Sequence, residues 1–211
     1  MLVAGCGFRG NGSPIVDGDI ASDARSDGPK DDGRAVDGSP DTAAAADAFV
    51  LICPMTYNLQ GGGSKYRLIP DGHRAWEQQV ACDSDSTDHR THLASIGSAN
   101  ELALLQGFVD GAMVGIAGDA VWIGATQAPN SAGTSDAWVE MSGASLFGGW
   151  QANEPNDIDG SEDGDEQFAS LHHMEEGLVD DIGDTHFGAI CECDGHAPAT
   201  LALTYFASNI H

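Results

Sequence analysis

The sequence predicts an α+β fold. Two segments have helical patterns, several short apolar segments are typical of strands, and one long irregular stretch runs from Thr126 to Asp184. The chain has 211 residues, and 41% of them are apolar. It is therefore long enough for one ordinary domain with extensions, and it can bury a hydrophobic core.

The two expected helices lie early in the domain. Residues 73–82 are expected to form the first, with Trp76 and Val80 four positions apart on the same face. The second begins at a capping box, because Ser98 is followed three positions later by Glu101. The inner stripe of this second helix consists of Leu102, Leu105 and Val109.

Short apolar segments predict the strands. Tyr66–Ile69, Val121–Gly124 and Phe187–Cys191 are the clearest of them. Between the last two, Gly, Asn, Asp, Ser and Pro dominate the sequence from 126 to 184. An irregular stretch of this length inside a compact domain usually carries function, so the functional site is expected there.

The chain is strongly acidic, with 33 Asp and Glu against 8 Lys and Arg and a formal net charge of −25. This balance argues against binding to nucleic acid or to an anionic membrane, because phosphate contacts need Lys and Arg. No Lys or Arg follows Arg90, whereas 19 Asp and Glu do. Such a density of carboxylates requires solvation or a counter-charge, and a divalent cation can supply the latter. The sequence contains no apolar run of about 18 residues, so it predicts no membrane-spanning helix.

The N-terminal residues 1–6 end in Val3–Cys6, which resembles the lipobox of bacterial lipoproteins, where the Cys becomes the lipidated first residue. The basic and apolar regions of a signal peptide do not precede Cys6, so either the true start lies upstream of Met1 or the match is a coincidence. Residues 7–48, rich in Gly, Asp, Ala and Ser, are expected to be a disordered tether. On this interpretation the protein is exported and lipid-anchored to the bacterial outer membrane or cell surface, and Cys6 is its only membrane contact.

Four further cysteines follow Cys6: Cys53, Cys82, Cys191 and Cys193. An even number in an exported chain predicts two disulfides, with three pairings open. Cys191 and Cys193 lie in one expected strand, and we expect them to point in opposite directions and to have different partners. No Cys-x-x-Cys pair indicates a zinc or redox site.

Acidic residues are densest between 154 and 184, where twelve occur and no Lys or Arg does. The most closely spaced acidic groups in this stretch are Glu154–Asp157, Glu162–Asp163 and Asp180–Asp181. Ca²⁺ takes six to eight oxygen ligands, from carboxylates and side-chain amides among others. Pro155 suits such a site, because an X-Pro bond can be cis and then brings the flanking side chains to one side. A solvated acidic loop is the alternative.

In their order and spacing these segments resemble the C-type lectin-like domain over residues 53–193. Its motifs are matched by Trp122-Ile123-Gly124, Glu154-Pro155-Asn156, Val179-Asp180-Asp181 and Ile190-Cys191-Glu192. Its first two helices and the link between them are matched by Trp76, Cys82, Leu93–Ile96 and Glu101. The resemblance implies two helices, short antiparallel sheets and a long irregular calcium-binding loop region. It places the domain at 49–194 and leaves 195–211 as an extension of unknown role, which could add a strand, mediate contacts or be an artefact of the reading frame.

The same resemblance implies the disulfides Cys82–Cys191 and Cys53–Cys193. A second inner disulfide of the family is absent, because Gly164 and Asp184 occupy its two positions. Both partners are replaced together, so no unpaired thiol remains. The long loop next to the expected site is thereby less constrained.

The resemblance further implies a Ca²⁺ site and a sugar site that share residues. The implied metal ligands are Glu154, Asn156, Glu162, Asp180 and Asp181. The implied sugar-binding residues are Glu154, Asn156, Glu162 and Asp180. In the family, Glu-Pro-Asn marks specificity for mannose- or glucose-type sugars, whose neighbouring 3- and 4-hydroxyls are equatorial. The expected function is calcium-dependent carbohydrate binding without catalytic residues.

Two departures from the family pattern bear directly on the expected calcium and sugar sites. Asp180 stands where the family usually has Asn, and a carboxylate has no N–H to donate to a sugar hydroxyl. This should strengthen Ca²⁺ binding and weaken or alter sugar binding, which favours the rival interpretation that calcium is structural and the ligand is a protein or another surface. Gln127 stands where a second calcium would need an acid, so a second ion is not expected although Asp157 and Asp163 match part of its site.

An enzyme at the acidic metal site is the remaining alternative. His172 and His173 are adjacent, and no His-Glu-x-x-His pattern exists. Neighbouring residues in a strand face opposite ways, so one inward and one outward His is the expected arrangement. No nucleophile elbow of the Gly-x-Ser-x-Gly type occurs either.

Overall fold

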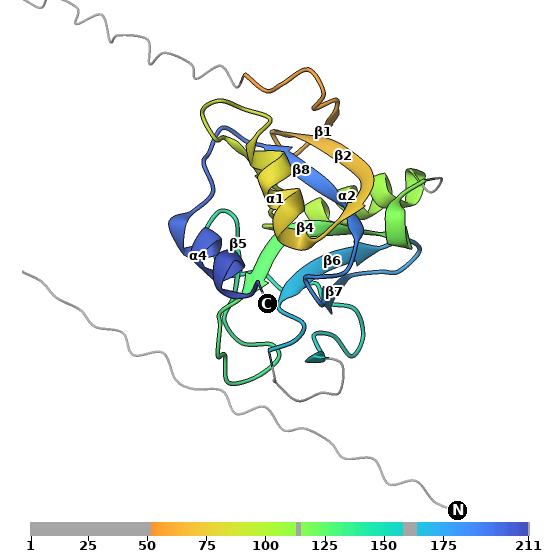
Figure 1. Ribbon diagram of the computed structural model, residues 1–211. Coiled ribbons are helices and arrows are strands. Elements are labelled where there is room, and N and C mark those ends of the chain that lie inside the picture. Colours follow the sequence, from red (N-terminus) through yellow and green to blue (C-terminus); the bar gives the residue numbers. More distant parts are fainter. Residues whose placement is uncertain (1–51, 113–114, 158–163, 211) are drawn as a thin grey trace, which may run out of the picture. The chain divides into compact units, whose positions relative to one another are not determined.

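A mixed sheet carries the fold of this computed structural model, which describes residues 52–112, 115–157 and 164–210 (Figure 1). The main path through the sheet is β1-β2-β8-β4-β6-β7, while β3 pairs with β8 and β5 pairs with β4. The strands are β1 (Leu59–Gly61), β2 (Ser64–His73), β3 (Thr91–Leu93), β4 (Ala120–Gln127), β5 (Trp138–Glu140), β6 (Phe168–His172), β7 (Leu178–Asp181) and β8 (Phe187–Cys193). The expected tether and Cys6 lie outside the described residues.

Helices cover both faces of the sheet. They are α1 (Ala75–Asp83), α2 (Ala99–Gly111), α4 (Thr200–Ser208) and the short 3-10 turn η1 (Ala117–Asp119). The predicted α+β class is confirmed. Among the described residues, none of the helices combines the length and the apolar character that a bilayer crossing requires.

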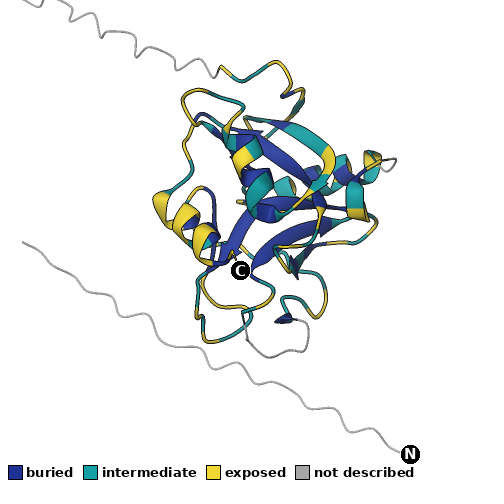
Figure 2. Ribbon diagram, viewed as in Figure 1, coloured by how far each residue is buried: buried dark blue, intermediate teal, exposed yellow. Residues whose placement is uncertain are grey.

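The two central strands, β4 and β8, are buried along their whole length (Figure 2). Side chains alternate between the faces of a strand, so each strand contributes to two separate apolar clusters. On one face, Trp122 of β4 and Ala189 of β8 pack with α1 and α4. On the other face, Ile123 and Ile190 pack with α2. The strands predicted at Val121–Gly124 and Phe187–Cys191 are therefore the centre of the fold.

The first helix begins at Ala75, and its predicted face is wrong. Val80 is 60% exposed, whereas Gln78 is fully buried. The Gln78 amide donates hydrogen bonds to the backbone oxygens of Asp71 at 2.7 Å and Phe187 at 2.9 Å. Because these bonds satisfy the buried Nε2 group of Gln78, this side chain can face inward although its Oε1 has no hydrogen-bond partner among the described residues. The buried residues of α1 are Ala75, Gln78, Gln79 and Cys82.

The second helix follows its prediction more closely. Leu105 and Val109 are fully buried, and Leu102 packs partly buried beside them. Ser98 Oγ accepts a hydrogen bond from the Glu101 backbone N–H at 3.3 Å, as an N-cap residue does. The Glu101 carboxylate instead accepts from the Gly97 N–H and the Tyr66 hydroxyl, so only half of the capping box forms.

Both disulfides join the pairs that the resemblance implies, Cys82–Cys191 and Cys53–Cys193. The expectation that Cys191 and Cys193 point in opposite directions is wrong. Two residues apart on β8, they project from the same face of the strand, and both belong to the cluster that contains Trp122. Their partners differ because Cys82 lies on α1, whereas Cys53 lies ahead of β1.

One loop prediction also needs correction, and one of the alternatives left open for the C-terminal extension is ruled out for the residues that the structure describes. The stretch from 126 to 184 is less irregular than expected, because β5, β6 and β7 lie within it. Within the described part of the C-terminal extension, Thr200–Ser208 form the helix α4 and no strand is added. Ala202 and Phe206 of this helix are buried against the sheet, while its outer side is exposed.

Candidate functional site

The segment around Pro155 is attached to β7 by backbone hydrogen bonds. Gln151 N donates to Leu178 O, and Leu178 N donates to Gly149 O, each at 2.9 Å. Gly177 permits this approach, since a Cβ there would lie 2.7 Å from Gln151 N and its φ is +114°. The Glu154–Pro155 peptide bond is cis.

Asp180 lies beneath this segment on β7 and is only 2% exposed. Both of its carboxylate oxygens accept the Asn156 backbone N–H at 3.0 Å, and one accepts the Asp157 N–H at 2.9 Å. Above it, the Asn156 side-chain amide donates a hydrogen bond to the Glu154 carboxylate. The structure therefore brings together three of the expected site residues, Glu154, Asn156 and Asp180.

The electrostatics of this group are those of crowded carboxylates. Burial, followed by the hydrogen bond and negative charge of Asp180, raises the pKa of Glu154 to about 7. Two carboxylates placed this closely favour a shared proton or a bound cation.

Asp181 makes a different set of contacts, although its negative charge also acts on Glu154. It follows Asp180 on β7, so the two side chains leave opposite faces of the strand. The Asp181 carboxylate lies 2.9 Å from His172 Nε2 and accepts a hydrogen bond from the Ser170 hydroxyl. Burial alone would lower the pKa of His172, but Asp181 more than offsets this and the pKa is raised. The neighbouring His173 instead contacts Asp110 of α2 at 3.2 Å.

The expected ligand set is therefore only partly assembled. Glu162, the fifth member, lies outside the described residues. Within 52–112, 115–157 and 164–210, no group of three or more His, Cys, Asp or Glu side chains is arranged to hold a metal ion. The donors that do converge are all oxygens, which suits Ca²⁺. A carboxylate offers about four lone-pair sites, so the backbone hydrogen bonds of Asp180 leave capacity for an ion.

Two residues shape the loops in ways that the sequence did not reveal. Asp157 is 2% exposed, and its carboxylate accepts the backbone N–H groups of Glu166 at 2.9 Å and Gly164 at 3.3 Å. Gln127 Nε2 donates to three backbone oxygens of the segment that follows β4. They are Gly133 O at 2.8 Å, Asp136 O at 3.0 Å and Thr134 O at 3.1 Å. For Gln127 the sequence offers only one signal, which is a polar residue shortly after the apolar segment Val121–Gly124. This signal does not identify its hydrogen-bond partners.

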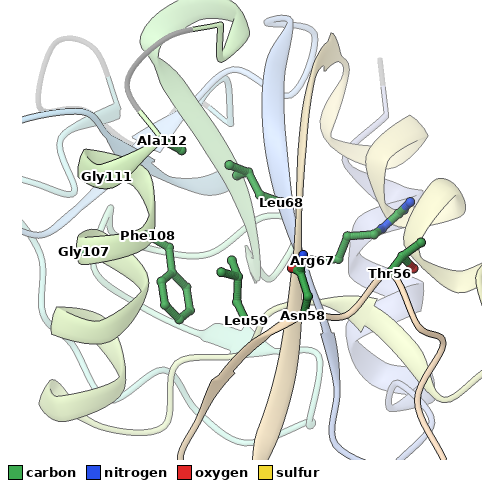
Figure 3. A pocket seen from close by; sticks show the side chains of 9 residues that line it. All are labelled: Thr56, Asn58, Leu59, Arg67, Leu68, Gly107, Phe108, Gly111 and Ala112. Atoms are coloured by element: carbon green, nitrogen blue, oxygen red, sulfur yellow. The ribbon is translucent and has the colours of Figure 1, made fainter.

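A separate pocket of about 670 Å³ lies between the β1–β2 hairpin and α2 (Figure 3). Leu59, Leu68 and Phe108 give it an apolar wall. Arg67 also lines it, but its guanidinium is paired with Asp85 at 2.7 Å. This pocket contains none of the expected site residues, so its chemistry is unrelated to that of the acidic loops.

Comparison with known proteins by sequence is negative, because no protein-family model and no curated protein matches the chain. Solved structures do match. The C-type lectin CEL-I from Cucumaria echinata has a TM-score of 0.55 at 19% identity, covering 66% of this chain and 96% of that chain. SPL-1 in complex with GlcNAc has a TM-score of 0.52 at 22% identity, covering 68% of this chain and 96% of that chain.

A calcium-independent type II antifreeze protein is similar as well. Its TM-score is 0.50 at 19% identity, over 72% of this chain and 99% of that chain. The match covers nearly the full length of each of these structures, although the sequence identity to each is low. The chain therefore has the C-type lectin-like fold, as its motifs indicate.

Proposed function

We propose that the domain binds carbohydrate through a Ca²⁺ ion held by the Glu154-Pro155-Asn156 segment. Asp180, Asp181 and Glu162 are the further proposed ligands. One observation carries the proposal: Glu154 and Asn156, on either side of a cis proline, meet above the buried carboxylate of Asp180. Acidic side chains gathered in this way, with the pKa of one raised to about 7, favour a cation between them.

The roles of the side chains follow from their chemistry. When bound, Ca²⁺ supplies coordination positions for two neighbouring hydroxyls of a sugar ring. Glu154 accepts a hydrogen bond from one hydroxyl, and the Asn156 amide donates one to a hydroxyl oxygen. The contact between Glu154 and Asn156 keeps the acceptor and the donor side by side, which suits two adjacent hydroxyls.

The preferred sugars are those with equatorial vicinal hydroxyls, of the mannose and glucose type. The order Glu154 before Pro155 and Asn156 after it is the basis of this preference. SPL-1, which shares the fold, is in complex with GlcNAc, a sugar of the glucose series. This module has no catalytic role in the proposal.

A second candidate function is binding of a protein or another surface, with calcium serving only the structure. Asp180 favours it, because its carboxylate is used by the Asn156 and Asp157 backbone N–H groups and offers no donor to a sugar. The antifreeze protein with this fold is calcium-independent, so the fold does not by itself require a calcium ion.

The setting of the domain is also a proposal. Cys6 is the proposed lipid anchor, and residues 7–48 are the proposed tether of an exported protein. A single shallow sugar site is weak, at roughly 4 kcal/mol for a millimolar affinity. Display of many copies on one surface would raise the avidity of such sites.

Calorimetry of the full chain tests the proposal. Ca²⁺ is titrated first, and mannose is then titrated into the calcium-loaded protein. The expected result is that both bind and that EDTA abolishes both. Calcium binding without mannose binding would favour the second candidate. Failure of calcium itself to bind would leave the acidic segments as a solvated loop.

A matched pair of variants locates the site. Asp181→Asn removes a proposed ligand charge and should weaken Ca²⁺ binding by about tenfold or more. Asp88→Asn makes the same change at a side chain that is 61% exposed and paired with Arg90, and it should leave Ca²⁺ affinity unchanged. Equal effects of the two variants would mean that calcium responds to overall charge and binds at no defined site.

A further inference from the structure

We propose that the C-terminal helix α4 is a positioning element for the loops of the candidate site, acting through Asn209 and Phe206. The helix lies outside the segment that resembles the lectin-like domain, and Figure 1 shows it beside β5. Its effect on ligand binding rests on the proposed function. Its effect on the order of the loops does not.

Asn209 attaches the end of α4 to the end of β4. It is 7% exposed, and its Nδ2 donates hydrogen bonds to Thr126 Oγ1 at 3.1 Å and to Gln127 O at 2.9 Å. Both amide hydrogens are thereby used. A buried amide without such partners would carry a desolvation cost, so the two bonds fix where the helix ends on the sheet.

Gln127 extends this attachment into the segment 128–137. Its own side-chain amide binds three backbone oxygens between Gly133 and Asp136. Trp138 Nε1 adds a bond to Thr134 O at 2.8 Å. The segment is thus folded around a side chain whose backbone is held by Asn209.

A series of hydrogen bonds continues from β4 to the candidate site. Thr126 Oγ1 donates to Gln167 O at 2.8 Å, and the next residue back, Glu166, donates its N–H to Asp157 at 2.9 Å. Asp157 in turn donates its N–H to Asp180 at 2.9 Å. Every member of the series is in contact with the next, from the residue that Asn209 holds to the carboxylate beneath Glu154 and Asn156.

The strands provide a second connection. Thr126 pairs with Phe168 across β4 and β6, and Phe168 pairs with Asp181 across β6 and β7. Phe206 of α4 packs edge-on against the Phe168 ring, with 5.1 Å between ring centroids. Helix α4 therefore contacts β4 and β6, and these two strands connect it through their pairing to Asp181 on β7.

Ala199 completes the placement of the helix. At the start of α4, its N–H donates to Met141 O at 2.7 Å. Met141 follows β5 and is fully buried. The helix is consequently held at both ends, by Ala199 at the first and by Asn209 at the second, which is what a positioning element requires.

Hydrogen exchange of the full chain with Asn209→Asp tests this role. The substitution keeps the size of the side chain and removes its N–H donors. We expect exchange to accelerate about fivefold or more in 128–137 and at the Asn156 and Asp157 amides, with β8 unchanged, as local opening predicts. The control is Ser208→Ala, since Ser208 is exposed and its hydroxyl donates a hydrogen bond to Thr204 O within α4 itself; this variant should change nothing.

Two results would overturn the proposal. One is exchange that stays unchanged in 128–137 or at the Asn156 and Asp157 amides. The other is a uniform acceleration that includes β8, since that would mean that α4 supports the whole fold and no particular loop. Gln127→Glu serves as a second variant, and it should accelerate exchange in 128–137 at least as much, because it removes the donor to three backbone oxygens.

Calcium and mannose titrations of the same variants separate this role from the proposed function. Exchange needs no ligand, so a faster loop in Asn209→Asp supports the α4 role even if the unaltered chain binds neither. If the unaltered chain binds calcium, Asn209→Asp should weaken that binding by about threefold or more, while Ser208→Ala should not. Unchanged exchange alongside intact calcium binding would overturn the α4 role and leave the proposed function in place.

Discussion

Around β8 the chain is held by two disulfides and by apolar side chains on both faces of the sheet. Around Pro155 it is held by carboxylates and amides that bind the backbone, chiefly those of Asp180, Asp157 and Gln127. Covalent and apolar contacts depend on volume and tolerate changes of charge nearby. Side-chain-to-backbone bonds depend on donor and acceptor identity, so substitutions that keep the shape but change the chemistry should act mainly in the second region.

The largest effect is expected in the first region, from Cys82→Ser. The Cys82–Cys191 disulfide joins residues 109 positions apart, and loss of a native disulfide typically costs about 2–5 kcal/mol. Urea unfolding should report this loss of unfolding free energy. The control is Ala81→Ser on the same helix, with an expected change within about 0.5 kcal/mol. A Cys82→Ser protein as stable as the unaltered one would contradict the structural role of this bond.

The next effect concerns Glu140 of β5, a carboxylate that is 2% exposed and has one oxygen without a hydrogen-bond partner. Burial raises the pKa of Glu140 from 4.5 to about 7; the hydrogen bond from Ser142 lowers this pKa, and the negative charge of Glu101 raises it further. Between pH 4.5 and 7 the folded state therefore holds a proton that the unfolded state has released. The contribution of Glu140 to stability therefore falls as pH rises from about 4.5 to 7.

Glu140→Gln should consequently stabilise the fold above pH 7 by up to about 3 kcal/mol and make little difference near pH 4.5. Denaturant unfolding across this pH range measures the difference between the two proteins. The same change at the exposed Glu176 serves as the control. A stability gain that is equal at both ends of the range would rule out titration of Glu140 as its cause.

A smaller effect is expected in the second region from Asp180→Asn. The amide oxygen can still accept the backbone N–H groups of Asn156 and Asp157, and the new N–H can donate to a sugar hydroxyl. Mannose affinity at saturating Ca²⁺ should rise about tenfold, which corresponds to roughly 1.4 kcal/mol, and it should rise more than Ca²⁺ affinity. Calorimetry measures both, and an unchanged mannose affinity would count against the donor argument.

The smallest effect is a change of preference from the paired substitution Glu154→Gln with Asn156→Asp. It exchanges acceptor and donor on the two sides of Pro155 while keeping the side-chain sizes. Preference should move from mannose toward galactose by roughly three- to tenfold, as measured by competition between the two sugars. If the preference does not move, the Pro155 segment is not where the sugar binds.

Local patterns predicted much of the first region. The strand at Val121–Gly124 and the stripe of Leu105 and Val109 are apolar runs of the right period, and burial confirms them. The face of α1 was wrong because Gln78, a polar residue, is turned inward by partners at Asp71 and Phe187. No periodicity of a single helix contains that information.

The α+β class, the central strands, the number of cysteines and the acidic segments on either side of Pro155 all follow from the amino-acid sequence. The packing of the strands is what turns Asp180 toward the backbone of the Pro155 segment and its neighbour Asp181 toward His172, and what brings Asn209 to Thr126. The partners of Asp180 and Asn209 are 24 and 83 residues away along the chain. Composition and spacing establish which groups need partners, but only the packing of the strands brings a particular donor to a particular acceptor.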